Sequence, residues 1–170
     1  MKKIFSLLLA VFFVFSLCSC SESVNMAVLT AYQNGGFEAE LKITAGGHEY
    51  RAALSKNEER LFLSFREPAA LESFTFIFDE KGTYISTGGE EIPFSAGGLF
   101  CLAEVYSLFT VPVAGTWKIE KARPGGVPLY ICENESTVLY IDANSRLPLK
   151  IVSGEIVADV LSFKTEAKAK

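Results

Sequence analysis

Apolar and polar residues alternate along most of this chain from Phe37 onward, and this period of two limits the fold more than any other feature. In residues 37–44 every second residue is apolar, and charged or hydroxyl side chains stand between them. Gly46-Gly47 follows, a pair that suits the positive φ angles of a two-residue hairpin turn. Such alternation is typical of antiparallel strands with one face in the core and the other in water. The predicted strands are 37–44, 49–54, 60–66, 74–79, 83–87, 117–121, 127–132, 137–142, 150–152 and 155–163.

Two segments have a helical spacing instead. The apolar residues of 24–33 recur at the three- and four-residue intervals of a helix, although a strand is the alternative there. Gly35-Gly36 is expected to end this helix, because glycine readily takes the left-handed conformation after a last turn. The second segment, 99–110, is apolar on nearly every side apart from Glu104 and Ser107. A helix of that kind must be covered on most sides, so we expect it to lie on the sheet.

These elements predict an α+β domain. We expect a curved antiparallel β-sheet, with an N-terminal helix and the inserted apolar helix covering its concave face. The chain has 170 residues, about the size of one domain. No linker and no repeat of solenoid length divides it. The prediction is therefore one domain over 24–163, followed by a solvated, lysine-rich tail over 164–170.

The N-terminus has the features of an export signal. Lys2-Lys3 precedes an apolar run over residues 4–17. A bilayer span needs roughly 20 residues, so this shorter run is typical of a signal peptide over 1–19. The run ends in Leu17-Cys18-Ser19-Cys20 and resembles a bacterial lipobox, in which Cys20 receives diacylglycerol and begins the mature chain. The alternative is an ordinary secretory signal peptide with an incidental Cys20.

Lipidation of Cys20 would hold the domain against a membrane. Two or three acyl chains, such as palmitate, give stable anchoring, whereas a single chain is marginal. The tether is short, because only residues 21–23 follow Cys20 before the first patterned residue, and an extended tether reaches about 10–15 Å. Loss of residues 1–19, two of them lysines, leaves 151 residues with a formal charge of −6. Such an acidic chain does not dock electrostatically on anionic lipid, so the acyl anchor must hold it.

The expected location is the cell envelope, on the extracytoplasmic side. In a bacterium with one membrane, the domain would lie on the outer face of the cytoplasmic membrane. In a bacterium with two, we expect the outer membrane, because Ser21 is not the aspartate that commonly signals retention at the inner membrane.

No arrangement of residues points to catalysis. His48, the one histidine, directly follows the glycine turn and has no nucleophile beside it. The pairs Asp79-Glu80 and Glu90-Glu91 lie next to turn glycines, where neighbouring side chains point apart. Gly88-Gly89 and Gly97-Gly98 lack the Lys-Ser/Thr that follows in a phosphate-binding loop. We expect a protein that is not an enzyme and holds no metal or cofactor, and its negative charge argues against nucleic acid as a partner.

Two cysteines remain after the predicted cleavage and lipidation. Cys101 lies in the apolar segment and Cys132 in a late strand. An extracytoplasmic location permits a disulfide between them, and two buried free thiols are the alternative. A bridge would close a loop of about 30 residues and stabilise the fold by roughly 3–4 kcal/mol.

Several local patterns, in their order along the chain, carry a family resemblance. They are the strand end Phe65-Arg66-Glu67-Pro68, the turn IFDEKGTYI over 77–85, the strand that begins at Trp117, and RLPLKI over 146–151. Together with the N-terminal helix, this order resembles the LolA/LolB superfamily of lipoprotein carriers and receptors. The resemblance covers 24–163 and implies an open half-barrel whose helices cover an apolar cavity for acyl chains.

The candidate ligand-binding residues are apolar side chains of the predicted concave face. They are Leu63, Phe65, Phe74, Phe76, Leu99, Leu102 and Phe109. In one interpretation they line a cavity of about 300 Å³ or more, and the protein binds or shields a lipid or the acyl chain of a lipoprotein. In the other they form a packed core, and the protein is a protein-interaction or envelope-sensing module with a membrane-protein partner. An esterase is a third hypothesis, without a nucleophile–base signature to support it.

Overall fold

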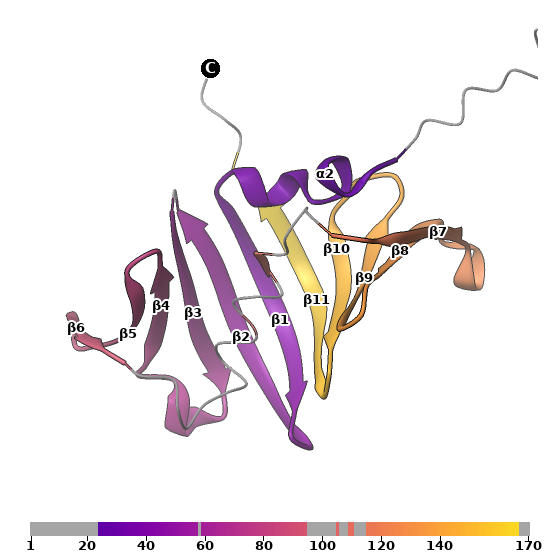
Figure 1. Cartoon of the computed structure of the whole chain (residues 1–170). Coiled ribbons are helices and arrows are strands. Elements are labelled where there is room, and N and C mark those ends of the chain that lie inside the picture. Colours follow the sequence, from indigo (N-terminus) through magenta and orange to yellow (C-terminus); the bar gives the residue numbers. More distant parts are fainter. Residues whose placement is uncertain (1–23, 58, 95–104, 106–108, 111–114, 167–170) are drawn as a thin grey trace, which may run out of the picture.

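One antiparallel sheet forms most of the protein (Figure 1). The computed structural model describes residues 24–57, 59–94, 105, 109–110 and 115–166. The strands are β1 (Phe37–Ala45), β2 (His48–Asn57), β3 (Arg60–Glu67), β4 (Thr75–Asp79), β5 (Gly82–Thr87), β6 (Glu90–Pro93), β7 (Lys118–Ala122), β8 (Leu129–Glu133), β9 (Thr137–Asp142), β10 (Pro148–Ser153) and β11 (Ile156–Thr165). The short helices are α2 (Met26–Leu29) and three 3-10 turns, η1 (Ala31–Asn34), η2 (Ala69–Leu71) and η3 (Pro124–Gly126).

The strands form an open sheet in the order β6-β5-β4-β3-β2-β1-β11-β10-β9-β8-β7. Strands β1 to β6 make one meander and β7 to β11 another. The two meanders join at the centre, where β1 pairs with β11 from Phe37–Thr165 to Thr44–Val157. Strands β6 and β7 are the two edges (Figure 1). The prediction of an antiparallel, one-sided sheet is therefore confirmed, and the sheet is not closed.

The strand register aligns the apolar side chains into rows that cross the sheet. The first apolar row crosses seven strands from β11 to β6 and consists of Phe163, Ala39, Leu54, Leu63, Phe76, Ile85 and Ile92. The second apolar row crosses seven strands from β7 to β2 and consists of Ile119, Cys132, Leu139, Ile151, Ala158, Ile43 and Tyr50. A slip of one residue in any strand would turn its apolar set to water, so burial of this face fixes the register.

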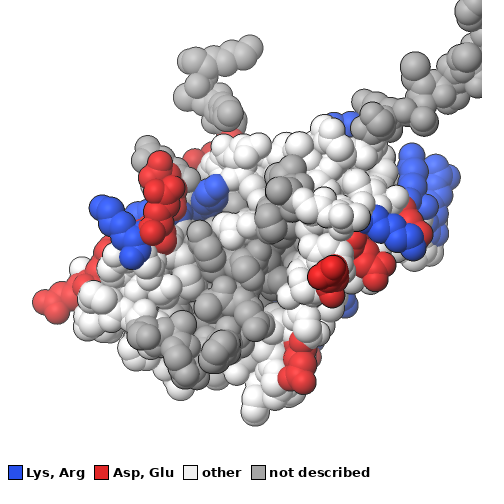
Figure 2. All heavy atoms as spheres, viewed as in Figure 1, with Lys and Arg blue, Asp and Glu red and all other residues white. Residues whose placement is uncertain are grey.

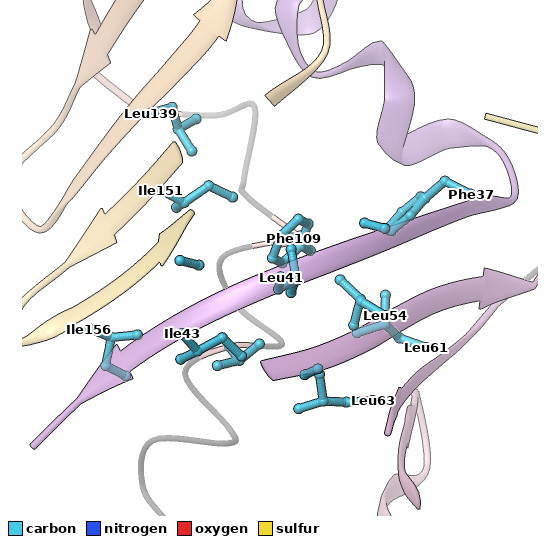
Figure 3. Packing of buried hydrophobic residues seen from close by; sticks show 14 of the residues in the cluster. Phe37, Leu41, Ile43, Leu54, Leu61, Leu63, Phe109, Leu139, Ile151 and Ile156 are labelled. Carbon is cyan, nitrogen blue, oxygen red and sulfur yellow. The ribbon is translucent and has the colours of Figure 1, made fainter. Parts of the chain in front are cut away.

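The core lies on the face of the sheet that carries both apolar rows. Figure 3 shows Phe109 lying beside Leu41 of β1, and both side chains are fully buried. The ring of Phe109 also lies 6.3 Å from that of Phe37. Met26 and Leu29 of α2 are buried in the same cluster. Each such side chain stabilises the fold by roughly 1.5–3 kcal/mol relative to exposure.

The N-terminal helix is shorter than predicted. The helical segment 24–33 is realised as α2 and η1, and Thr30 lies between them with its hydroxyl and its backbone N–H both donating to the carbonyl of Met26. The prediction of a left-handed glycine at the end of this helix is wrong, because the backbone of Gly35 is extended, with φ −135°. Gly36 lies against the end of β11: its carbonyl accepts from the N–H of Glu166 at 2.9 Å, and a Cβ at Gly36 would displace the end of the Glu166 side chain. The strand alternative for this segment is not adopted.

The structure differs from the predicted strands at two places. The last strand, β11, continues past residue 163, because Lys164 and Thr165 pair with Glu38 and Phe37 of β1. The predicted tail therefore begins in ordered strand, and 167–170 lie outside the described residues. Strand β6 is not among the predicted strands, and it pairs with β5 after the Gly88-Gly89 turn.

The inserted apolar helix over 99–110 is not confirmed. Val105, Phe109 and Thr110 are described, and the first two are buried in the core. The other residues of this segment lie outside the described part of the chain. Among the helices that the structure does describe, none is long and apolar enough to cross a membrane.

Candidate apolar binding face

The seven candidate ligand-binding residues divide into three groups. Four are fully buried in the core: Leu63, Phe65, Phe76 and Phe109. Phe74 is partly exposed at the margin of the core. Leu99 and Leu102 lie outside the described residues. The described candidates thus lie on one face of the sheet. Most of them are buried by other residues and have almost no surface exposed to solvent.

A chain of four aromatic rings crosses β2, β3 and β4 and ends just after β6. Tyr50 meets Phe65 with ring centroids 5.7 Å apart, Phe65 meets Phe76 at 5.9 Å, and Phe76 meets Phe94 at 6.1 Å. All three contacts are edge to face, the arrangement favoured by aromatic quadrupoles. We call Tyr50, Phe65, Phe76 and Phe94 the aromatic arm. Its two inner rings are buried, whereas Tyr50 and Phe94 remain partly exposed.

The apolar face extends beyond the part that is buried. Next to the aromatic arm, the side chains that pack on the core but stay partly exposed are Leu71, Phe74 and Ile85. The first apolar row ends at Ile92 on the edge strand β6, and Ile92 is 53% exposed. These four residues leave apolar surface exposed at this end of the sheet, and exposed apolar surface is a feature of binding sites.

The opposite end of the first apolar row is sealed. The rings of Phe37 and Phe163 stack with centroids 4.9 Å apart, and Tyr32 of η1 meets Phe163 edge to face at 5.4 Å. Gln33 donates a 3.3 Å hydrogen bond to the Tyr32 hydroxyl. Burial raises the pKa of Tyr32 to about 12, so this phenol stays neutral. The exposed end of the apolar face is therefore the β4–β6 end.

Three pockets are lined entirely by described residues, and each lies outside the buried core. One of about 610 Å³ lies between α2, η1 and the turn from β9 to β10. A second, of about 380 Å³, lies on the outer face of β1–β3 and β11, among Glu38, Glu40 and Ser64. The third, of about 350 Å³, lies beside β5 and β6, between Tyr84 and Phe94. None of these three pockets is lined by a candidate ligand-binding residue.

The cysteine of the second apolar row is a free thiol. Cys132 is fully buried, between Ile119 and Leu139 of the neighbouring strands. Burial raises its pKa to about 11, because desolvation disfavours the thiolate. Cys101 lies outside the described residues, so the disulfide between the two stays a prediction.

The charged groups singled out in the sequence have structural roles or lie in solvent. His48 is exposed at the start of β2. Asp79 accepts from the backbone N–H groups of Lys81 and Gly82 at 2.8 and 3.1 Å and so shapes the turn into β5. Glu91 accepts from Arg60 at 2.7 Å. Within the described part of the chain, no group of three His, Cys, Asp or Glu side chains gathers as a metal site.

Tyr50, Phe94 and Ile92 are not among the candidate ligand-binding residues of the sequence analysis. Tyr50 was predicted on the apolar face of a strand, and no strand was predicted over Ile92 and Phe94. One signal was available: Gly88 and Gly89 have positive φ angles of 62° and 89°, as Gly46 and Gly47 do. The same two-residue hairpin pattern therefore predicts a strand over 90–93.

The fold is similar to that of two solved proteins, both with a TM-score above 0.5. An uncharacterised conserved protein of Thermus thermophilus aligns over 83% of this chain and 85% of its own, with 14% identity and a TM-score of 0.54. MucB aligns over 84% of this chain with 15% identity and a TM-score of 0.52, and the chain spans 57% of MucB.

A LolA superfamily protein, NE2245 of Nitrosomonas europaea, aligns over 86% of this chain and 96% of its own, with 11% identity and a TM-score of 0.41. MucB has also been crystallised with MucA, in the complex from Pseudomonas aeruginosa. At these identities the likenesses show the fold alone. No protein-family model and no curated protein sequence matches the chain.

Proposed function

We propose that this protein is a membrane-anchored, extracytoplasmic lipoprotein that binds or shields an apolar chain on the exposed end of its apolar face. The ligand class is the acyl chain of a lipid or of another lipoprotein. One observation supports this most directly: the aromatic arm leads from the buried ring of Phe76 to the partly exposed ring of Phe94, which follows β6, the strand that carries the 53% exposed Ile92. The proposal is of a binding module and not of an enzyme.

The aromatic arm suits such a ligand for a simple physical reason. Each methylene removed from water contributes about 0.8 kcal/mol, and the partly exposed rings of Tyr50 and Phe94 offer rigid apolar area without a buried polar group. In Figure 2 the described acidic and basic side chains gather mainly toward the two sides of the view. An acyl chain would lie across β4–β6, and a deeper position would require displacement of Phe109 or Val105 from the core.

Mass spectrometry of co-purified lipid tests the proposal. The soluble fragment 21–170, purified without detergent, is expected to carry a detectable amount of co-purified lipid. The variant Ile92→Ser should carry less, because it removes apolar area at the exposed end. Leu161→Ser is the matched control, since Leu161 is 57% exposed on β11, away from the aromatic arm. Absence of lipid from all three proteins would contradict the proposal.

A second candidate function is a protein-interaction module on the same fold. The likeness to MucB, which forms a complex with MucA, favours it, as does the burial of four candidate side chains in the core. A partner chain would then cover Ile92 and the edge strand β6 in place of an acyl chain. The lipid measurement separates the two candidates, since an interaction module would carry no co-purified lipid.

A further inference from the structure

The cap formed by α2 and η1 has an uncharged outer surface. No charged residue occurs over 24–37. Met26 and Leu29 point into the core, whereas Ala27 and Ala31 are exposed and Val28 is partly exposed. In Figure 2 the region over this cap, at the top of the view, is largely white.

A groove separates the cap from the turn between β9 and β10. It has a volume of about 610 Å³, and Ala27, Val28 and Ala31 form one side of it. Arg146 and Leu147 of the turn form the other side, and Arg146 is exposed in the left-handed conformation at φ 59°. The groove thus combines small apolar side chains with one cation.

The carboxylate of this turn is engaged within the turn itself. Asp142 accepts from the backbone N–H groups of Asn144 and Ser145 at 3.0 and 2.7 Å, and from the Ser145 hydroxyl at 2.9 Å. These bonds lower the pKa of Asp142. The lining of the groove contains no carboxylate, although the chain as a whole is acidic.

The position of the lipidated cysteine determines which end of the sheet faces a membrane. Cys20 precedes Val24 by four residues, and this length of extended chain spans about 14 Å. Val24 packs against the core at the cap. Strand β1 runs from the cap to the hairpin at Gly46-Gly47 over nine residues, about 30 Å at 3.3 Å per residue. The tether reaches a bilayer easily from the cap and not from the hairpin.

We propose that the cap and the β9–β10 turn form a membrane-docking surface, with Ala27, Val28, Ala31 and Leu147 at the lipid interface. The occupant of the groove is thus the lipid surface itself. This inference rests on lipidation of Cys20, which belongs to the proposed function. It adds the orientation: the cap faces the bilayer, and the Gly46-Gly47 hairpin points away from it.

Tryptophan quenching in vesicles tests this orientation. The chain has one tryptophan, so a Trp117→Phe background gives single-tryptophan variants of the lipidated full-length protein. Ala31→Trp reports on the cap, with Ala27→Trp as a second reporter in case the first does not fold. His48→Trp is the matched control, because His48 is equally exposed and lies beside the far hairpin. Each variant is reconstituted into phosphatidylcholine–phosphatidylglycerol vesicles with brominated acyl chains.

Quenching is expected to be several-fold stronger at positions 31 and 27 than at position 48. Equal quenching at all three positions, in protein that floats with the vesicles, would overturn the docking surface and leave the anchor intact. Protein that does not float with vesicles would contradict lipid anchoring and the docking surface together. Ligand binding at the aromatic arm is measured separately on the soluble fragment, so its failure does not affect this result.

Discussion

The ring of Phe76 meets the ring of Phe94 edge to face, with centroids 6.1 Å apart, and this contact joins the buried core to the exposed edge of the sheet. Phe76 is fully buried in β4, whereas Phe94 follows the edge strand β6 and is partly exposed. The backbone N–H of Phe94 donates to the Thr83 carbonyl at 2.8 Å, which positions this ring over β5. Stability and ligand binding should therefore separate along the aromatic arm.

Truncation of the two rings tests this separation. Phe76→Ala is expected to lower the free energy of unfolding by about 3–5 kcal/mol, the usual effect of removing a buried phenylalanine. Phe94→Ala should have a clearly smaller effect, because its ring is partly exposed and leaves no closed cavity. Urea unfolding followed by circular dichroism measures both. Equal losses for the two variants would contradict the assignment of Phe94 to the margin of the core.

Arg60 of β3 links to the edge strand β6 through an ion pair. It donates to Glu91 at 2.7 Å, lies 3.6 Å from Asp79, and its guanidinium lies 5.6 Å from the ring centroid of Phe62. Because exposed ion pairs add little to global stability, Arg60→Gln should leave the unfolding midpoint nearly unchanged. Hydrogen exchange of amides in β5 and β6 should nevertheless become faster, since local opening needs less free energy than global unfolding.

The control for this prediction is Lys118→Gln. Lys118 pairs with Glu120 at 2.8 Å within the other edge strand, β7. The Lys118→Gln variant should leave hydrogen exchange of the amides in β5 and β6 unchanged. If Arg60→Gln and Lys118→Gln affect those amides equally, Arg60 does not hold β6.

Stability should decline above about pH 9. The Cys132 thiol has its pKa raised by burial from an ordinary value of 9.0 to about 11. Below pH 9 the thiol is protonated in both states, and the contribution of its burial is fully present. Between pH 9 and 11 the unfolded chain loses the proton and the folded chain keeps it, so the free energy of unfolding falls by up to about 1.4 kcal/mol per pH unit. Urea unfolding between pH 8 and 10, with reductant present, measures this slope.

Cys132→Ala is the control for the pH dependence. The variant is less stable, but its stability should vary less between pH 9 and 10. Above pH 10 both proteins should decline, because the pKa of Tyr32 is raised from 10.0 to about 12 and the same argument applies to its phenol. An equal slope for both proteins below pH 10 would contradict the role of the thiol.

Alkylation measures whether Cys132 is bonded to Cys101. A free, fully buried Cys132 should resist iodoacetamide in the folded protein. It should react once the protein is unfolded without reductant, together with Cys101. A disulfide, the sequence-based alternative, would leave both residues unreactive under those conditions until reductant is added.

The local pattern of the chain was sufficient to predict every described strand except β6, but not the arrangement of the strands in the sheet. Alternation placed Leu61, Leu63 and Phe65 on one face, and the Gly46-Gly47 hairpin followed from turn chemistry. The pairing of β1 with β11 brings together residues more than a hundred positions apart, as in Phe37–Thr165. Local periodicity carries no information about such a pairing. The helix of 24–33 was interrupted because Thr30 caps α2 with bonds to Met26.

The candidate site was predicted in its core and missed at its margin. Phe65, Phe74 and Phe76 were found because alternation marks the apolar side of a strand. Alternation does not show which of these side chains other residues cover, so it did not separate buried Phe65 from partly exposed Phe74. Ile92 was missed because a four-residue edge strand with two glutamates and a proline resembles a loop.

The measurement that tests the central proposal most directly is a titration of the soluble fragment 21–170 with a fluorescent fatty acid. Saturable binding is predicted for the wild type and for Leu161→Ser, and markedly weaker binding for Phe94→Ser, which removes the exposed end of the aromatic arm. If the wild type shows no saturable binding, or if Phe94→Ser and Leu161→Ser bind equally well, the protein does not hold an apolar chain on this face.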